Sequence, residues 1–212
     1  MSAMFMGLPI ETAPDVLVPR AETELLCHEA LRRVDEAHAR IVVDLCCGSG
    51  NLACALATLR PSLQVWASDL TDACVALARR NVERCGLAAR VTVVKGDLMA
   101  SLQHLAGTVD VLVCNPPYIS TGRLVAESAH LLESEPREAF DGGPYGLTIH
   151  QRVVRESPPL LTETGWLAFE MGLGQERQLE LVFQRAKTFG PRTLVNDAAG
   201  APRVVSAQRI PR

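Results

Sequence analysis

The segment IVVDLCCGSGNLACALATL, residues 41–59, joins an apolar run of strand length to a turn with two glycines and then to a helical pattern. Four further apolar runs follow, with segments of helical periodicity between them. Runs that are apolar throughout are typical of strands covered on both faces, and their alternation with helices predicts a parallel sheet with right-handed crossovers. The expected strands are Ile41–Leu45, Val65–Ser68, Val91–Lys95, Val109–Cys114 and Trp166–Glu170, and the expected helical segments lie near Leu52–Leu59, Asp72–Cys85, Met99–Leu105, Gly146–Leu161 and Gln175–Lys187.

The two ends of the chain complete this pattern. Thr193–Asn196 and Val204–Gln208 flank a turn too short for a helix, which predicts an antiparallel hairpin. An α/β chain of this kind resembles the Rossmann-like fold of class I methyltransferases, whose seven strands are ordered 3-2-1-4-5-7-6.

Near the start, Glu22–Ala39 has the pattern of one amphipathic helix. We therefore expect an N-terminal extension and helix over residues 1–40 and the main domain over residues 41–212. The long irregular stretch from 118 to 144 has weak helical character only near residues 124–132.

Composition and charge narrow the class of protein. A chain of 212 residues with 48% apolar and 21% charged residues is typical of one globular domain. With a net charge of −3, the chain as a whole has no positive electrostatic potential that would attract nucleic acid or anionic membranes. There is no apolar run of about 18 residues that would cross a membrane, and no secretory signal pattern at the start. The seven cysteines form no CxxC pair, which favours reduced, buried thiols in a cytoplasmic protein over disulfides or a zinc site.

The turn after the first expected strand has the features of a cofactor-binding loop. Gly48 and Gly50 permit a tight turn and close approach of a ligand, and the free N–H groups of the next helix face the same place. Asp44, at the strand end, can hold the cationic amino group of a methionine moiety directly or through a water. Gly48, Gly50 and Ala53 also satisfy the dinucleotide fingerprint GxGxxG/A, so this loop alone leaves a nicotinamide cofactor open.

Two more acids end the next two strands. Asp69 can accept both hydroxyls of a ribose through charge-assisted bonds, or it can cap the following helix. Asp97 can accept from an adenine amino group, or it can cap the next short helix. Ligands of open α/β sheets bind at the carboxyl ends of the strands, so these acids together predict an S-adenosylmethionine site. The predicted cofactor contacts are Asp44, Cys46, Gly48, Gly50, Asp69, Leu70, Asp97, Leu98 and Asn115.

The fourth expected strand ends in the sequence Asn-Pro-Pro-Tyr, residues 115–118. Strand termination explains the two prolines but neither the asparagine nor the tyrosine. The side-chain oxygen of Asn115 and the carbonyl of Pro116 can each accept one N–H of a planar acceptor, which turns its lone pair toward a sulfonium methyl. Tyr118 would offer a flat face to that acceptor. Catalysis would then rest on positioning, with nitrogen and methyl carbon about 3–3.5 Å apart and without a metal. A dehydrogenase has no use for this motif, so it excludes the nicotinamide alternative.

These motifs together resemble the protein N5-glutamine methyltransferases, which modify the Gly-Gly-Gln motif of peptide-chain release factors. The resemblance covers nearly the whole chain. It rests on VLVPRAETELL (16–26), DLCCGSG (44–50), NPPYI (115–119), EPREAFDGGPYGL (135–147), FEMGLGQ (169–175) and DAAGAPRVV (197–205). It implies S-adenosylmethionine as cofactor, a clamp for the acceptor formed by Asn115, Pro116 and Tyr118, and a place for Pro19–Glu24 beside the pocket.

Two departures from that family bear on the expectations. Cys46 stands where the family has its first loop glycine, so either the turn does not need a positive φ there or the loop is reshaped. The helical domain that grips the release factor in the family has no counterpart among the residues before Pro19. The acceptor is therefore expected to be a glutamine of a release factor or another protein, or a planar nitrogen of a small molecule. Glu170 either bonds a glutamine-like substrate or has a structural role.

Two other function classes stay open at this point. An exocyclic-amine methyltransferase acting on RNA or DNA can use the same clamp, but 4% aromatic residues and a negative net charge argue against it. A non-catalytic cofactor-binding subunit would have no reason to keep an intact clamp. The sequence does not indicate the oligomeric state.

Overall fold

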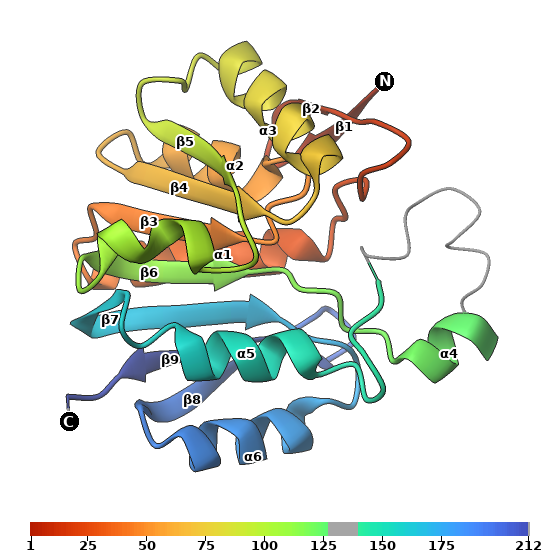
Figure 1. Cartoon of the computed structure of the whole chain (residues 1–212), viewed down its shortest axis with the longest axis vertical. Coiled ribbons are helices and arrows are strands. Elements are labelled where there is room, and N and C mark those ends of the chain that lie inside the picture. Colours follow the sequence, from red (N-terminus) through yellow and green to blue (C-terminus); the bar gives the residue numbers. More distant parts are fainter. Residues whose placement is uncertain (127–139, 212) are drawn as a thin grey trace.

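The computed structural model describes residues 1–126 and 140–211. Its central sheet has seven strands in the order β5-β4-β3-β6-β7-β9-β8, which confirms the expected order and the α/β methyltransferase fold (Figure 1). The first five of these strands are parallel, and β9 is antiparallel to both of its neighbours. The strands are β3 (Ile41–Leu45), β4 (Gln64–Asp69), β5 (Val91–Lys95), β6 (Val109–Cys114), β7 (Leu161–Glu170), β8 (Phe189–Asn196) and β9 (Pro202–Arg209).

Helices cover both faces of this sheet (Figure 1). Strand side chains alternate between the faces, so Val42 packs with the residues of α1 to α3 and Val43 with those of α5 and α6. These two apolar layers enclose strands that are buried on both sides, as their continuous apolar runs predict. The helices are α1 (Thr23–Glu36), α2 (Asn51–Leu59), α3 (Asp72–Arg84), α4 (Thr121–Ala126), α5 (Thr148–Glu156) and α6 (Glu176–Ala186), and Ala100–Leu105 forms a 3₁₀ helix.

The structure departs from the sequence expectations in the bounds of several elements, and β8 begins at Phe189 rather than at Thr193. The helix expected over Gly146–Leu161 ends at Glu156, because Pro158 and Pro159 follow and cannot continue it. The strand expected from Trp166 begins earlier, at Leu161, and the register of β6 with β7 shifts between Val109 and Val111. The weak helical segment near 124–132 corresponds to α4 only as far as Ala126, and its remainder lies outside the described residues.

A hairpin at the start of the chain was not expected. Strands β1 (Ser2–Phe5) and β2 (Leu8–Glu11) pair in antiparallel fashion across Met6 and Gly7, which both have positive φ. Such angles are required by a tight two-residue turn of the primed type. The hairpin is held to α3 by Asn81, whose side chain accepts from the Glu11 N–H and donates to the Glu11 carbonyl.

The described residues also bear on membrane and metal binding. None of the helices within 1–126 and 140–211 has the length and apolar character needed to span a membrane. The same part of the chain holds no cluster of His, Cys, Asp and Glu side chains suited to a metal ion. All seven cysteines have free thiols.

Candidate active site

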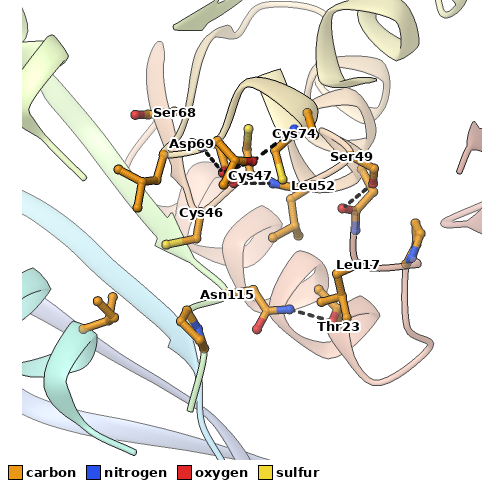
Figure 2. A pocket seen from close by; sticks show the side chains of 18 of the residues that line it. Leu17, Thr23, Cys46, Cys47, Ser49, Leu52, Ser68, Asp69, Cys74 and Asn115 are labelled. Carbon is orange, nitrogen blue, oxygen red and sulfur yellow. Dashed lines mark hydrogen bonds between the residues drawn. The ribbon is translucent and has the colours of Figure 1, made fainter. Parts of the chain in front are cut away.

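A cavity of about 510 Å³ opens at the carboxyl ends of β3 to β6, where the sequence places the cofactor (Figure 2). Seven of the predicted residues line it, namely Cys46, Gly48, Asp69, Leu70, Asp97, Leu98 and Asn115. The segment before α1 also contributes, through Asp15, Leu17, Val18, Pro19 and Arg20. This agrees with the place beside the pocket that the resemblance implies for Pro19–Glu24. Asp44, Gly50, Pro116 and Tyr118 are not among the residues that line this cavity.

Three residues of the loop after β3 have a left-handed backbone conformation. Cys46, Gly48 and Gly50 have φ values of 55°, 53° and 76°. A Cβ added at Gly50 would lie 3.1 Å from the Cβ of Ala78 in α3, so glycine also allows the two helices to approach here. The expectation that Cys46 might not need a positive φ is wrong. The turn keeps the left-handed geometry, and the cysteine bears a conformational cost of about 1–2 kcal/mol.

Asp44 is fully buried beneath this loop. Its Oδ2 accepts from the Ala53 N–H at 3.1 Å, and its Oδ1 has no partner among the described residues. Burial raises the pKa of this carboxyl to about 8. The role of Asp44 toward the cationic amino group of a methionine moiety, directly or through a water, stays a prediction.

Asp69 ends β4 at the wall of the cavity. Its Oδ2 accepts from the Gly48 N–H at 2.9 Å and its Oδ1 accepts from the Thr71 N–H at 3.1 Å (Figure 2). The helix α3 is capped by Thr71, whose hydroxyl oxygen accepts from the Cys74 N–H, so the alternative that Asp69 caps the helix is wrong. The Thr71 hydroxyl also donates to Oδ1, at 3.5 Å, whereas Oδ2 keeps a second lone pair that could accept a ribose hydroxyl.

Asp97 lies on the rim of the cavity after β5. Its side chain is 53% exposed and accepts from Nη1 of Arg152 on α5 at 2.9 Å. The residue at the cap position of the 3₁₀ helix is Met99, so the alternative that Asp97 is a helix cap is wrong as well. The pairing with Arg152 was not foreseen, because it joins residues 55 positions apart in the sequence. Leu98 next to it is buried and has a φ of 52°.

The side chain of Asn115 is hydrogen-bonded to Thr23, which in turn is hydrogen-bonded to Glu170. Its Nδ2 donates to Oγ1 of Thr23 at 3.0 Å, and that hydroxyl donates to Oε2 of Glu170 at 2.8 Å (Figure 2 shows the first bond). Among the described residues nothing donates to Oδ1 of Asn115, so this oxygen remains an acceptor in a side chain that lines the cavity. The sequence analysis did not predict that Thr23 contacts Asn115. The only indication was that Thr23 lies within Pro19–Glu24, the segment expected beside the pocket.

Tyr118 lies on the other side of the motif from the cofactor cavity. Its hydroxyl donates to Oε1 of Glu170 at 3.0 Å, and its ring lines a neighbouring cavity of about 400 Å³ together with Arg203 and Gln175. Burial and the nearby Glu170 raise the pKa of Tyr118 above its usual value. Both oxygens of Glu170 are therefore engaged by the protein, which favours the structural role for this carboxylate. The stacking role of Tyr118 toward an acceptor stays a prediction.

Comparisons with known proteins show the family of this chain. Residues 22–143 match the family described as methyltransferase small domain. A release factor glutamine methyltransferase of Geobacter sulfurreducens is 40% identical over 96% of this chain and 69% of its own length. A 4-amino-L-phenylalanine/4-methylamino-L-phenylalanine methyltransferase of Streptomyces pristinaespiralis is 36% identical over 86% of this chain and 62% of its own.

A solved structure shows the same fold at lower identity. The N-terminal domain of human METTL16 in complex with SAH superposes with a TM-score of 0.67 at 19% identity, over 95% of this chain and 76% of that one. Together with the cavity and the Asn-Pro-Pro-Tyr motif at its edge, these similarities show that the chain is an S-adenosylmethionine-dependent methyltransferase and belongs to the methyltransferase small domain family.

Proposed function

We propose that this enzyme methylates the side-chain amide nitrogen of a glutamine in a protein, as the names of its release factor relatives suggest. The observation that carries the proposal is the fixed amide of Asn115. Its nitrogen is tied to Thr23, so its oxygen is the group available to a substrate N–H. This arrangement recognises a neutral nitrogen that still carries hydrogens.

Three residues that line the cavity, together with Asp44 buried beneath its loop, would hold the parts of the cofactor. Asp69 would hold the ribose hydroxyls, Asp44 the cationic amino group, and Asp97 with Leu98 the adenine. S-adenosylmethionine supplies an electrophilic methyl group on a sulfonium. The loop leads into α2, whose first residues Asn51 and Leu52 line the cavity, so the positive end of this helix would face the bound molecule.

The acceptor side of the site works by orientation. An amide nitrogen is a poor nucleophile because its lone pair is delocalised. The Asn115 oxygen and the Pro116 carbonyl would each accept one of its hydrogens, which directs the lone pair and stabilises positive charge growing on the nitrogen. The prolines fix φ and so preset the direction of that carbonyl.

A second candidate acceptor is an aromatic amine on a free amino acid. It is favoured by the relative named as a 4-amino-L-phenylalanine methyltransferase, because that amino acid also presents a planar nitrogen. Both candidates suit the same clamp, because each nitrogen is planar and bears two hydrogens. The size and charge of the rest of the substrate distinguish them.

The test is methyl transfer from labelled S-adenosylmethionine to four acceptors in parallel. These are a bacterial release factor, a short peptide containing Gly-Gly-Gln, 4-amino-L-phenylalanine and total RNA, each also incubated with Asn115→Ala. We expect label in the release factor and in the peptide, on the glutamine, and none with the variant. Label confined to the aromatic amino acid would support the second candidate, and label confined to RNA would refute both.

Three further expectations remain predictions. The division into an extension over residues 1–40 and a domain over residues 41–212 is one, although α1 packs directly on the sheet. A cytoplasmic location, consistent with seven free thiols, is the second. The release factor as the physiological partner is the third, and the assay above addresses it.

A further inference from the structure

We propose that Thr23 and Glu170 are positioning residues for the reaction, which hold the amide of Asn115 so that its oxygen, and not its nitrogen, meets the acceptor. This inference rests on the proposed function, because it assigns a role to residues behind the clamp. Neither residue needs to touch the substrate in order to act.

The direction of each hydrogen bond follows from what each group can donate. The carboxylate of Glu170 only accepts, so the single hydroxyl hydrogen of Thr23 points to it. The Thr23 oxygen is then left with lone pairs and can only accept from Asn115. The amide of Asn115 must therefore turn its NH₂ group toward Thr23. Its oxygen takes the opposite direction, where it serves as an acceptor.

The chain of bonds is anchored in rigid structure. Thr23 is the first residue of α1 and Glu170 is the last residue of β7, and each is 2% exposed. Nε2 of the buried His150 in α5 donates to the Glu170 backbone carbonyl at 2.9 Å. Three elements from separate parts of the sequence thus fix the position of one side-chain amide. Buried and fully engaged groups of this kind hold geometry better than a loop alone.

The second oxygen of the same carboxylate reaches the far end of the motif. Oε1 of Glu170 accepts from the Tyr118 hydroxyl, and Nη2 of Arg203 lies 3.4 Å from that hydroxyl oxygen as a further donor. One carboxylate therefore fixes both the first and the last residue of the Asn-Pro-Pro-Tyr segment. Loss of the negative charge of Glu170 would weaken the hydrogen bonds that hold Asn115, through Thr23, and Tyr118 at the same time.

Removal of the Thr23 hydroxyl tests whether the hydrogen bond from Asn115 to Thr23 matters for methyl transfer. Thr23→Val keeps the shape of the side chain, and Thr23→Ser keeps the hydroxyl. We expect kcat for the glutamine peptide to fall at least tenfold in the valine variant and to recover to at least half of wild type in the serine variant. The Kd for S-adenosylhomocysteine should stay within twofold in both. Thr188→Val, which alters another buried threonine far from the site, is the matched control and should keep full activity.

A double-mutant cycle asks whether Thr23 acts through Asn115. If it does, Thr23→Val added to Asn115→Ala lowers the residual single-turnover rate less than twofold. A drop as large as in the wild-type background would overturn the proposal. Glu170→Gln provides a second test should Thr23→Val not fold. The glutamine can donate to Thr23, so the Thr23 hydroxyl is freed to donate to the Asn115 oxygen, and we expect at least tenfold lower kcat. Full turnover in that variant would also overturn the proposal.

A spectroscopic readout separates this inference from the proposed function. In wild type and Thr23→Ser, one side-chain N–H of Asn115 should exchange with solvent at least tenfold more slowly than in Thr23→Val, as seen by ¹⁵N NMR without any acceptor. Equal exchange rates would refute the positioning role, whatever substrate the enzyme uses. A wild-type protein that shows the slow exchange but leaves the glutamine peptide unmodified would refute only the proposed function.

Discussion

The protonation of Asp44 gives the protein a measurable dependence of stability on pH. The carboxyl is fully buried, and burial raises its pKa to about 8 from the value of 3.8 that is usual for an exposed aspartate. The folded state therefore binds more protons than the unfolded state between these two values. The stability from this group is fully present below about pH 4 and is lost as the pH rises through 8.

The size of the effect follows from the two pKa values. The slope is about 1.4 kcal/mol per pH unit within the window, and it flattens near the folded pKa, so the free energy of unfolding falls by about 2 kcal/mol from pH 6 to pH 8. Asp44→Asn removes the titration while keeping the shape. The difference in stability between variant and wild type should grow by that amount over the same interval, and the titration of other groups cancels in it.

Urea unfolding, followed by circular dichroism at pH 6, 7 and 8 without cofactor, measures this difference. Saturating S-adenosylhomocysteine should abolish its pH dependence, because a cationic amino group beside Asp44 keeps the carboxylate ionised throughout. A difference that stays constant between pH 6 and pH 8 without cofactor would show that the buried carboxyl is not protonated. That result would contradict the effect of burial on the pKa of Asp44, and a pH dependence that persists with saturating S-adenosylhomocysteine would contradict the placement of the amino group beside this carboxyl.

Three further predictions concern the loop, the ribose site and the buried histidine. Asp69→Ala should weaken binding of S-adenosylhomocysteine at least tenfold by calorimetry, since two charge-assisted hydrogen bonds are lost; unchanged affinity would exclude the ribose role. Cys46→Gly should change the free energy of unfolding by less than about 1 kcal/mol, because relief of the left-handed strain offsets the added freedom of the unfolded chain, whereas Cys46→Val should cost about 2 kcal/mol. Urea unfolding decides this, and a glycine variant less stable than the valine variant would contradict the strain argument. Burial lowers the pKa of His150 to about 4, so its contribution to stability is present above pH 6.5 and is lost as the pH falls toward 4. In the Asp44→Asn background, which lacks the opposing titration of Asp44, a further His150→Gln substitution should remove a fall of about 2 kcal/mol in the free energy of unfolding between pH 7 and pH 5, and an unchanged pH dependence would mean that His150 is already charged in the folded protein.

The sequence predicted the sheet well, because each of its parallel strands is a continuous apolar run bounded by helical periodicity. It placed the three acids at the strand ends for the same reason, since the last residue of each run marks the carboxyl edge. The hairpin of residues 2–11 escaped notice because its strands are only four residues long and its turn contains a single glycine. The early end of α5 is encoded locally, because Pro158 and Pro159 follow the helix and cannot continue it.

The roles of individual site residues were harder to predict from sequence. Asp69 and Asp97 each had two interpretations, and only the observed caps at Thr71 and Met99 removed the helix-capping alternative. The bonds from Asn115 to Thr23 and from Thr23 to Glu170 join residues 92 and 147 positions apart. No local pattern encodes such contacts, because they arise only when α1 and β7 pack against the end of β6.

The proposed function requires that this site binds a side-chain amide through its N–H groups and methylates its nitrogen. The most direct measurement is mass spectrometry of a Gly-Gly-Gln peptide incubated with S-adenosylmethionine and either the wild-type enzyme or Asn115→Ala. We predict one added methyl group on the glutamine nitrogen with wild type, and a rate about a hundredfold lower with the variant, which should still bind the cofactor normally. A peptide left unmodified by the wild-type enzyme, or methylated equally fast by the variant, would contradict the account.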